Sequence, residues 1–425
     1  MTAVGAAHPL VRPAGGGSAL AAGRRGRVPR WARLPGYVVA GVALLSLGRA
    51  LTGAGQLTAE GTLQSALALA LPVALAGLGG LWAERAGVVN IGLEGMIVLG
   101  TWFGAFGGVY YGPWAGVALG VAGGAVGGLL HAIATVTFGV DHIISGVAIN
   151  ILGVGLTDFL TTVSYGGGST RESPPLPNNV GRVDLLPFLK APLRTLSGQH
   201  RFFLSDLADL VLALTASVSL LIVVSLLLFP LSWYVLWKTP LGLRLRSVGE
   251  DPDAADSLGV KVYGLKYLAV IVSGALAGLG GVVLVYLFSG QFLSGQTNGR
   301  GFIGLAAMIF GNWRPGGLIV GAGLFGFMDS MQSQVEETSH ALLVVVALVF
   351  VVAGVWTLVQ RRWKATVLFV ALALGCWWWY AQTTELPREI IPYFPHLTTL
   401  LVLVFASQRL RMPAADGRVW RRSGR

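Results

Sequence analysis

The sequence predicts an all-α, polytopic membrane protein with about ten transmembrane helices, a broken or re-entrant pair of helices, and both termini in the cytoplasm. Hydrophobic residues make up 54% of the 425 residues, charged residues make up only 12%, and the mean hydropathy is +0.69. Soluble domains carry roughly a quarter charged residues. Apolar runs near the roughly 20 residues that a helix needs to cross hydrocarbon recur from residue 35 onwards. We therefore expect one membrane domain over residues 35–407 and no separate soluble domain.

Two basic tails flank this domain. Residues 1–34 contain no acid, are rich in Gly, Ala, Pro and Arg, and are expected to be disordered. Their arginines precede the first apolar run, which places the N-terminus in the cytoplasm, and residues 408–425 form a second basic cytoplasmic tail. The net charge is +11, and the basic residues are concentrated in these tails and in short loops. We therefore favour a role in setting membrane topology and in attracting lipid headgroups over a role in binding nucleic acid. The lone Cys376 excludes a disulfide framework and a cysteine metal site.

The first seven predicted spans alternate between the two sides of the membrane. They are residues 36–52, 62–82, 87–111, 113–138, 142–163, 206–236 and 267–290. Counted from the inside, the polar loop at 239–266 falls in the cytoplasm after the sixth span, and its basic residues agree with that side. The proline-rich loop at 165–205 falls on the outer side.

A pair of short apolar pieces interrupts this pattern. Residues 302–310 and 318–327 are each too short to cross comfortably, and the segment GNWRPGG at 311–317 separates them. Irregular backbone at membrane depth is tolerated only where protein or a water-filled cavity surrounds it, and discontinuous helices mark the pathway in many transporters. Three further spans, at 341–359, 365–382 and 391–407, then return the chain to the cytoplasm.

The polar loop contains a compact helix with its own start and stop signals. In the stretch GLRLRSVGEDPDAADSLG, Asp251 suits the N-cap and Pro252 the first helical position. Gly259 suits a left-handed stop. Ala254 and Ala255 between them are small enough to let another protein approach the backbone closely. We therefore predict a short docking helix outside the membrane.

Two further stretches place polar residues in apolar surroundings. In ERAGVVNIGLEGM, Asn90 and Glu94 fall at membrane depth. Two roles are open for Glu94: a structural one, in which a helix end or Arg85 neutralises its charge, and a functional one, in which it faces the substrate pathway. In DHIISGVAIN, Asn150 lies on an otherwise apolar span. For His142 in the same stretch, a satisfied position at a helix end is favoured over metal ligation, because no second His stands at ligand spacing.

Glycine recurs at every fourth position from Gly116 through Gly120 and Gly124 to Gly128, on one face of the predicted fourth span. Such a face lets a neighbouring helix come within backbone contact. Packing within the subunit is favoured over a dimerisation motif.

Together these stretches resemble the permease subunits of prokaryotic ABC importers for nucleosides and simple sugars, of the kind fed by a basic-membrane-protein-type lipoprotein. The resemblance covers about residues 61–418, in family order. The stretches that carry it are ERAGVVNIGLEGM, DHIISGVAIN, TPLGLRLRSVGEDPDAADSLGVKVYGLKYLAVIVSGALAGLGG, GRGFIGLAAMIFGNWRPGG and IPYFPHLTTLLVLVFASQRLRMPAADGR.

The resemblance implies a coupling loop that such permeases insert into a cleft of an ATPase subunit. The residues that correspond to it are Gly249, Glu250, Asp253, Ala254, Ala255 and Gly259. It also implies alternating access, a second related permease in a heterodimer, and an extracytoplasmic substrate-binding lipoprotein. The chain has no G-x-x-x-x-G-K-[ST] loop, so ATP and Mg²⁺ are expected on the separate ATPase, with no cofactor or metal on this chain.

The substrate pathway is predicted from polar and aromatic residues beside the helix breaks. The candidates are Asn90, Glu94, Asn150, Phe292, Thr297, Arg300 and Phe302. One departure from the family is an apparent insertion of about two spans at residues 341–382. The rival prediction is a secondary transporter or channel that acts alone, which needs no docking helix. Whether the solute is a nucleoside or a sugar stays open.

Overall fold

The computed structural model describes residues 33–166, 172–177, 179–333, 336–384, 386–387, 393 and 410–422. This part of the chain is mostly helical, and seven of its helices are long and apolar enough to cross a membrane. The predicted last span at 391–407 and nearly all of the N-terminal tail lie outside the described residues, so the predicted total of about ten spans stays a prediction.

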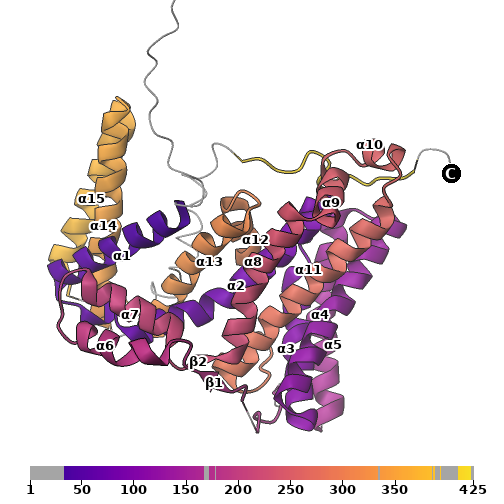
Figure 1. Cartoon of the computed structure of the whole chain (residues 1–425), viewed down its shortest axis with the longest axis horizontal. Helices are drawn as coiled ribbons and strands as arrows, with labels where there is room; N and C mark the ends of the chain where they lie inside the picture. The colour runs from indigo at the N-terminus through magenta and orange to yellow at the C-terminus, as the bar shows by residue number, and fades with distance from the viewer. Residues whose placement is uncertain are drawn as a thin grey trace, which may run out of the picture.

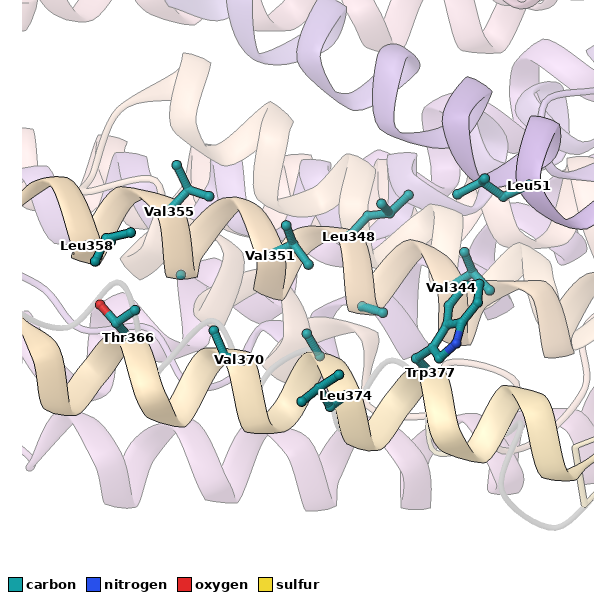
Figure 2. Close-up of a pocket in the computed structure, with 13 residues that line it drawn as sticks. Leu51, Val344, Leu348, Val351, Val355, Leu358, Thr366, Val370, Leu374 and Trp377 are labelled. Carbon is teal, nitrogen blue, oxygen red and sulfur yellow. The ribbon is translucent and has the colours of Figure 1, made fainter.

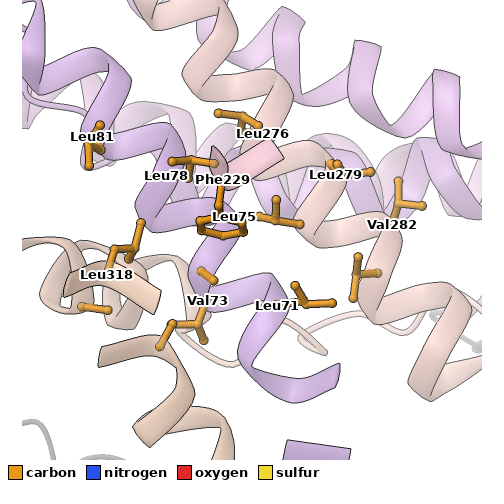
Figure 3. Packing of buried hydrophobic residues seen from close by; sticks show 14 of the residues in the cluster. Leu71, Val73, Leu75, Leu78, Leu81, Phe229, Leu276, Leu279, Val282 and Leu318 are labelled. Atoms are coloured by element: carbon orange, nitrogen blue, oxygen red, sulfur yellow. The ribbon is translucent and has the colours of Figure 1, made fainter. Parts of the chain in front are cut away.

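Helix α2, Glu60–Arg85, lies at the centre of the bundle (Figure 1). It is apolar around its whole circumference, as expected for a helix with protein on every side. Its neighbours include α8 (Leu220–Lys238), α11 (Val262–Leu284, continued by a π-helical turn at Val285–Ser289), α12 (Arg300–Phe310) and α13 (Pro315–Ser330). Figure 3 shows the core at this crossing, where Leu75 and Leu78 of α2 meet Phe229, Leu276 and Leu318 from three of those neighbours.

Helices α3 (Leu93–Tyr111), α4 (Pro113–Ala132, continued by a π-helical turn at Ile133–Thr137) and α5 (His142–Tyr165) form one side of the bundle (Figure 1). The glycine row of α4 faces α3 and α11. A Cβ at Gly124 would lie 2.2 Å from the carbonyl oxygen of Gly274, and one at Gly120 would lie 2.8 Å from that of Gly100. The predicted role of these glycines in packing within the subunit is confirmed.

Adding one methyl group to this contact is expected to destabilise the subunit. In Gly278→Ala the new Cβ would lie 2.5 Å from the carbonyl oxygen of Gly120 and 2.9 Å from the Cα of Gly124. These are backbone atoms that cannot rotate away, so overpacking should lower the free energy of unfolding by about 1–3 kcal/mol. Thermal unfolding in detergent measures the loss. Gly264→Ala is the matched control, since it lies on the same helix with nothing within 4 Å of its Cβ position; equal melting temperatures for the two variants would contradict the prediction.

The predicted single span at 206–236 is wrong. The chain forms two helices here, α7 at Leu204–Thr215 and α8 at Leu220–Lys238, and only α8 is long enough to cross. Between them, β2 (Val218–Ser219) pairs with β1 (Arg182–Val183), and the Ser217 backbone N–H donates to Asp184 at 2.6 Å. The side chain of Ser219 then caps α8. These contacts come from a distant segment, so hydropathy did not reveal the break.

A further group of helices lies toward the opposite side from α3–α5 (Figure 1). Helix α1 is Arg33–Thr52, and a 3-10 turn at Gly55–Leu57 follows it. Helices α14, Glu336–Val359, and α15, Trp363–Gln382, form a hairpin after a 3-10 turn at Met331–Ser333. The predicted insertion at 341–382 falls on this hairpin, whose two helices are each long enough to span a membrane. Helix α6 (Pro187–Ser197) packs with α7 at the lower edge of the view.

Candidate functional site

The predicted docking helix is present as α10, Pro252–Ser257, which follows α9 at Pro240–Glu250. The Asp251 carboxylate accepts a hydrogen bond from the Ala254 N–H at 3.0 Å, Pro252 is the first helical residue, and Gly259 has a φ of +81°. All three are the start and stop signals that the sequence predicted. Figure 1 places α10 at the end of the molecule opposite β1, β2, α6 and α7.

The two alanines of this helix do not share an exposed face. Ala254 is exposed, but Ala255 is only 3% exposed and packs with Val248 and Val262. Successive helical residues differ by about 100° in direction, so one of an adjacent pair turns toward α9 and α11. Leu258, at the end of α10, instead projects outward and is 85% exposed. The prediction missed it, although it is a large apolar residue at the end of a polar stretch.

The flanking residues of the predicted coupling set have different surroundings. Gly249 is buried, and a Cβ there would lie 2.3 Å from the carbonyl oxygen of Arg85, so α9 touches the end of α2 backbone to backbone. Glu250 is exposed and accepts from the N–H of Ala414 at 3.3 Å. The Arg246 guanidinium lies 5.8 Å from the centroid of the Trp237 ring and helps to hold α9 on the end of α8.

Two stretches that the sequence analysis treated separately meet at the C-terminal end of α2. The indole N–H of Trp313, in the turn between α12 and α13, donates to Glu84. The Arg85 guanidinium donates to the Trp313 carbonyl at 2.8 Å. Asn312 and Trp313 have φ values of +54° and +51°, and this left-handed backbone separates α12 from α13 into two short helices. The predicted interruption of the apolar pair is confirmed.

The segment between α2 and α3 is irregular, and two asparagines satisfy its backbone. Asn90 is fully buried, donates to the Ser273 hydroxyl at 2.9 Å and accepts from the Gly92 N–H at 3.1 Å. Asn150 of α5 accepts from the Gly95 N–H at 2.8 Å and donates to the Ile91 carbonyl at 3.0 Å. Protein therefore surrounds this non-helical backbone, as membrane depth requires.

His142 is a satisfied residue at the start of α5, as the sequence analysis favoured. Its Nδ1 accepts from the Val89 N–H at 3.2 Å, and the neighbouring Asp141 caps the helix through the Ile143 and Ile144 N–H groups. Within the described ranges, no three His, Cys, Asp or Glu side chains gather in a way that would hold a metal ion.

Glu94 occupies the N-terminus of α12. Its two carboxylate oxygens accept from the Gly299 N–H at 2.9 Å and from the Gly301 N–H at 2.6 Å. A carboxylate at this position satisfies otherwise unpaired donors and complements the positive end of the helix dipole. The sequence analysis named a helix end and Arg85 as the two structural partners that could neutralise Glu94. The structure shows the helix end in this role.

The other pathway candidates divide between the surface and the interior. Arg300 pairs with Asp329 at 2.6 Å, and Phe302, in the first turn of α12, is 47% exposed. Phe292 and Thr297 are buried. The structure thus brings Glu94, Arg300 and Phe302 together at the start of α12 and turns Phe292 and Thr297 inward. Their role in a pathway stays a prediction.

Asp158 of α5 lies near this region, and the prediction missed it. Its carboxylate accepts from the Ser294 hydroxyl at 2.8 Å, in the loop that leads to α12. The available signal was a single acid within an apolar span, which is costly unless it is paired or faces water.

A cavity of about 320 Å³ lies between α1, α14 and α15. Its lining residues are aliphatic apart from Thr366 and Trp377, as Figure 2 shows, and the Thr366 hydroxyl already pairs with Thr357 and the Arg362 carbonyl. A solute rich in hydroxyl groups would lose its hydrogen bonds to water here without replacement. The cavity is therefore unsuited to a sugar or nucleoside.

Residues 410–422, which we call the C-terminal strap, run across the end of the molecule that carries α9 and α10 (Figure 1). The Ala415 N–H donates to the Gly249 carbonyl at 2.9 Å. The next residue, Asp416, faces Glu84, Arg85 and Lys266, and burial raises the pKa of Asp416 to about 7. The sequence analysis expected only a basic tail here.

A bundle of long apolar helices with two interrupted segments defines a polytopic helical membrane protein of the kind that builds transport pathways. The family described as branched-chain amino acid transport system, permease component, matches residues 62–354. The chain belongs to this family and is a multi-pass protein of the cell membrane.

Three relatives cover most of their own length in the comparison. The guanosine ABC transporter permease of Bacillus subtilis is 37% identical over 62% of this chain and 79% of its own. A putative glucose ABC transporter permease of Haloferax volcanii is 34% identical over 84% of this chain and 96% of its own. A nucleoside ABC transporter permease of Lactococcus lactis is 36% identical over 61% and 78%. No solved structure matches the chain.

Proposed function

We propose that this chain is the permease subunit of an ABC importer and forms the translocation pathway for a nucleoside or a simple sugar. The observation that carries the proposal is α10, a capped helix with an exposed leucine beyond the membrane helices, in a member of a transport permease family. Permeases named for guanosine, nucleoside and glucose transport are among the relatives and support the substrate class.

The energy for transport comes from a separate ATPase. The sequence has no phosphate-binding loop of the G-x-x-x-x-G-K-[ST] type, so ATP and Mg²⁺ bind to the partner and not to this chain. ATP can shift the permease between outward-open and inward-open states only through contacts that differ between those states. Helix α10 offers a surface for such contacts, and transport proceeds by alternating access.

The charges around α12 favour an uncharged solute. Half-helix N-termini in transporters often bind anionic groups of the substrate, but Glu94 already occupies the N-terminus of α12. The nearby Arg300 is paired with Asp329. An amino acid carboxylate would have to displace one of these partners. A nucleoside or sugar needs only hydrogen bonds and an aromatic surface, and Phe302 supplies the latter.

The full importer contains this permease with about ten spans and both termini in the cytoplasm, a second related permease, and an extracytoplasmic binding lipoprotein. Helix α5 carries a row of exposed apolar side chains, including Ile144, Ile151 and Phe159. These side chains contact either lipid or the second permease. The binding protein reaches the loop at 165–205. The competing function, a transporter that works alone, requires no ATPase.

Uptake into proteoliposomes tests the proposal. The chain is reconstituted with the proposed ATPase and second permease, and with the lipoprotein added on the binding side. We expect hydrolysable ATP to drive accumulation of labelled guanosine or glucose, but not of leucine. Accumulation without the ATPase, driven by an ion gradient, would favour the solitary transporter and overturn the proposal. Ligand released from the purified lipoprotein separates nucleoside from sugar.

A further inference from the structure

One end of the C-terminal strap contacts the two interrupted segments of the membrane domain. The Arg411 backbone N–H donates to the Asn312 side chain at 2.8 Å, in the turn between α12 and α13. Ala415 lies against the irregular segment after α2, where a Cβ at Gly87 would be 3.2 Å from the Ala415 carbonyl oxygen. Ala415 is buried by these contacts.

The other end of the strap holds α10. The Trp420 indole N–H donates to the Asp253 carboxylate at 2.7 Å, and the Trp420 ring lies 5.1 Å from the ring of Tyr263 at the start of α11. The Arg422 guanidinium pairs with Asp256 at 3.0 Å. Two of the three acids in Asp251–Asp256 are thus bound by the strap.

These contacts leave the outward face of α10 free. Ala254, Leu258 and Gly259 remain exposed while the strap occupies the side of the helix that carries Asp253 and Asp256. The strap therefore leaves Ala254, Leu258 and Gly259 open to the ATPase, although it contacts Glu250 and Asp253, two other residues of the predicted coupling set. It also joins that helix to the α2–α3 segment and to the α12–α13 turn.

We propose that the C-terminal strap is a second coupling element, which transmits displacement of α10 to the α2–α3 segment and to the α12–α13 turn. The proposal rests on the proposed function. Helix α9 contacts the α2–α3 segment directly at Gly87, and α11 contacts it through Ser273 and Asn90. The strap reinforces that connection and adds a contact with the α12–α13 turn through Asn312. The strap contacts α9, α10, α11 and both interrupted segments. It therefore supplies a continuous set of contacts through which a displacement of α10 can reach those segments.

The test releases the strap from α10 without substituting any residue of the coupling loop, and it leaves the exposed Ala254, Leu258 and Gly259 unchanged. The variant Trp420→Ala/Arg422→Ala removes both side-chain contacts with α10. Met412→Ala/Arg418→Ala is the matched control, because it removes one large side chain and one arginine that are both exposed on the same strap. The full importer is purified with each variant, and co-purifying ATPase, ATP hydrolysis and solute uptake are measured in proteoliposomes.

We expect the Trp420/Arg422 variant to retain its ATPase and to hydrolyse ATP, while uptake per ATP hydrolysed falls about fivefold or more, within the range of typical coupling energies. The control should behave as wild type. Unchanged uptake per ATP in the Trp420/Arg422 variant would overturn the proposal. The proposal would also be overturned if the variant lost part of its ATPase while the complexes that kept the ATPase took up solute normally. Failure of the proposed function would give a different result. In that case a substitution on the exposed surface of α10, Leu258→Glu, would leave the association with the ATPase unchanged.

Discussion

Replacing Leu258 with Glu is expected to remove the ATPase from the purified complex. The side chain is 85% exposed in the isolated subunit, and burial of a leucine in a partner's cleft contributes about 1.5–3 kcal/mol. A carboxylate at the same position loses that contribution and adds a buried, unpaired charge. Together these changes should weaken association at least about tenfold, since roughly 1.4 kcal/mol corresponds to a factor of ten. Co-purification of the ATPase from membranes measures the effect.

Leu185→Glu is the control for that experiment. Leu185 is also an exposed leucine, but it lies between β1 and α6, at the end of the molecule opposite α10 (Figure 1). The same change in size and charge there should leave the ATPase bound. If Leu258→Glu co-purified with the ATPase at the wild-type level and transported normally, α10 would not be the docking helix.

Glu94→Ala is expected to damage both folding and transport. The substitution leaves the Gly299 and Gly301 N–H groups without an acceptor at the start of α12. A buried donor left without an acceptor lowers the free energy of unfolding by about 1–3 kcal/mol, and of these two glycines Gly301 is buried. Glu94→Gln keeps an acceptor oxygen and should lose less stability. Thermal unfolding in detergent and uptake in proteoliposomes give the two readouts.

The pair of readouts separates the two roles of Glu94. A variant that melts normally but does not transport would assign Glu94 to the pathway, whereas loss of both would assign it to the cap of α12. Glu172→Ala is the control, because Glu172 is an exposed carboxylate that accepts from the side chain of Gln291, and it should change neither readout. Normal melting and normal transport in Glu94→Ala would contradict the importance of this carboxylate altogether.

Features set by neighbouring residues were predictable from the sequence. The cap, first turn and stop of α10 depend on Asp251, Pro252 and Gly259, all within nine residues of one another. The break at GNWRPGG follows from glycine and proline in a short apolar region. The packing role of the α4 glycines follows from their four-residue spacing, which places them on one helix face.

Features that depend on distant segments were not predictable in this way. The inward turn of Ala255 is decided by α9 and α11, and the end of α7 by a pairing between Val218–Ser219 and Arg182–Val183. Glu94 carries no local sign that its partners lie some 200 residues later, at Gly299 and Gly301. Hydropathy and periodicity describe one segment at a time, so contacts between segments need the folded chain.

The glycine contacts among α3, α4 and α11 also limit where the subunit can change shape. Helices that meet through side chains can slide past each other by exchanging rotamers, but Gly100, Gly120, Gly124 and Gly278 bring backbone against backbone. No side chain lies between those atoms to absorb a small shift, and packed interfaces of this kind have discrete arrangements instead of a continuous range. The three helices therefore behave as one solid part, and Gly153 of α5 and Gly301 of α12 make similar backbone contacts with α3. Movement during transport has to occur outside this group of helices.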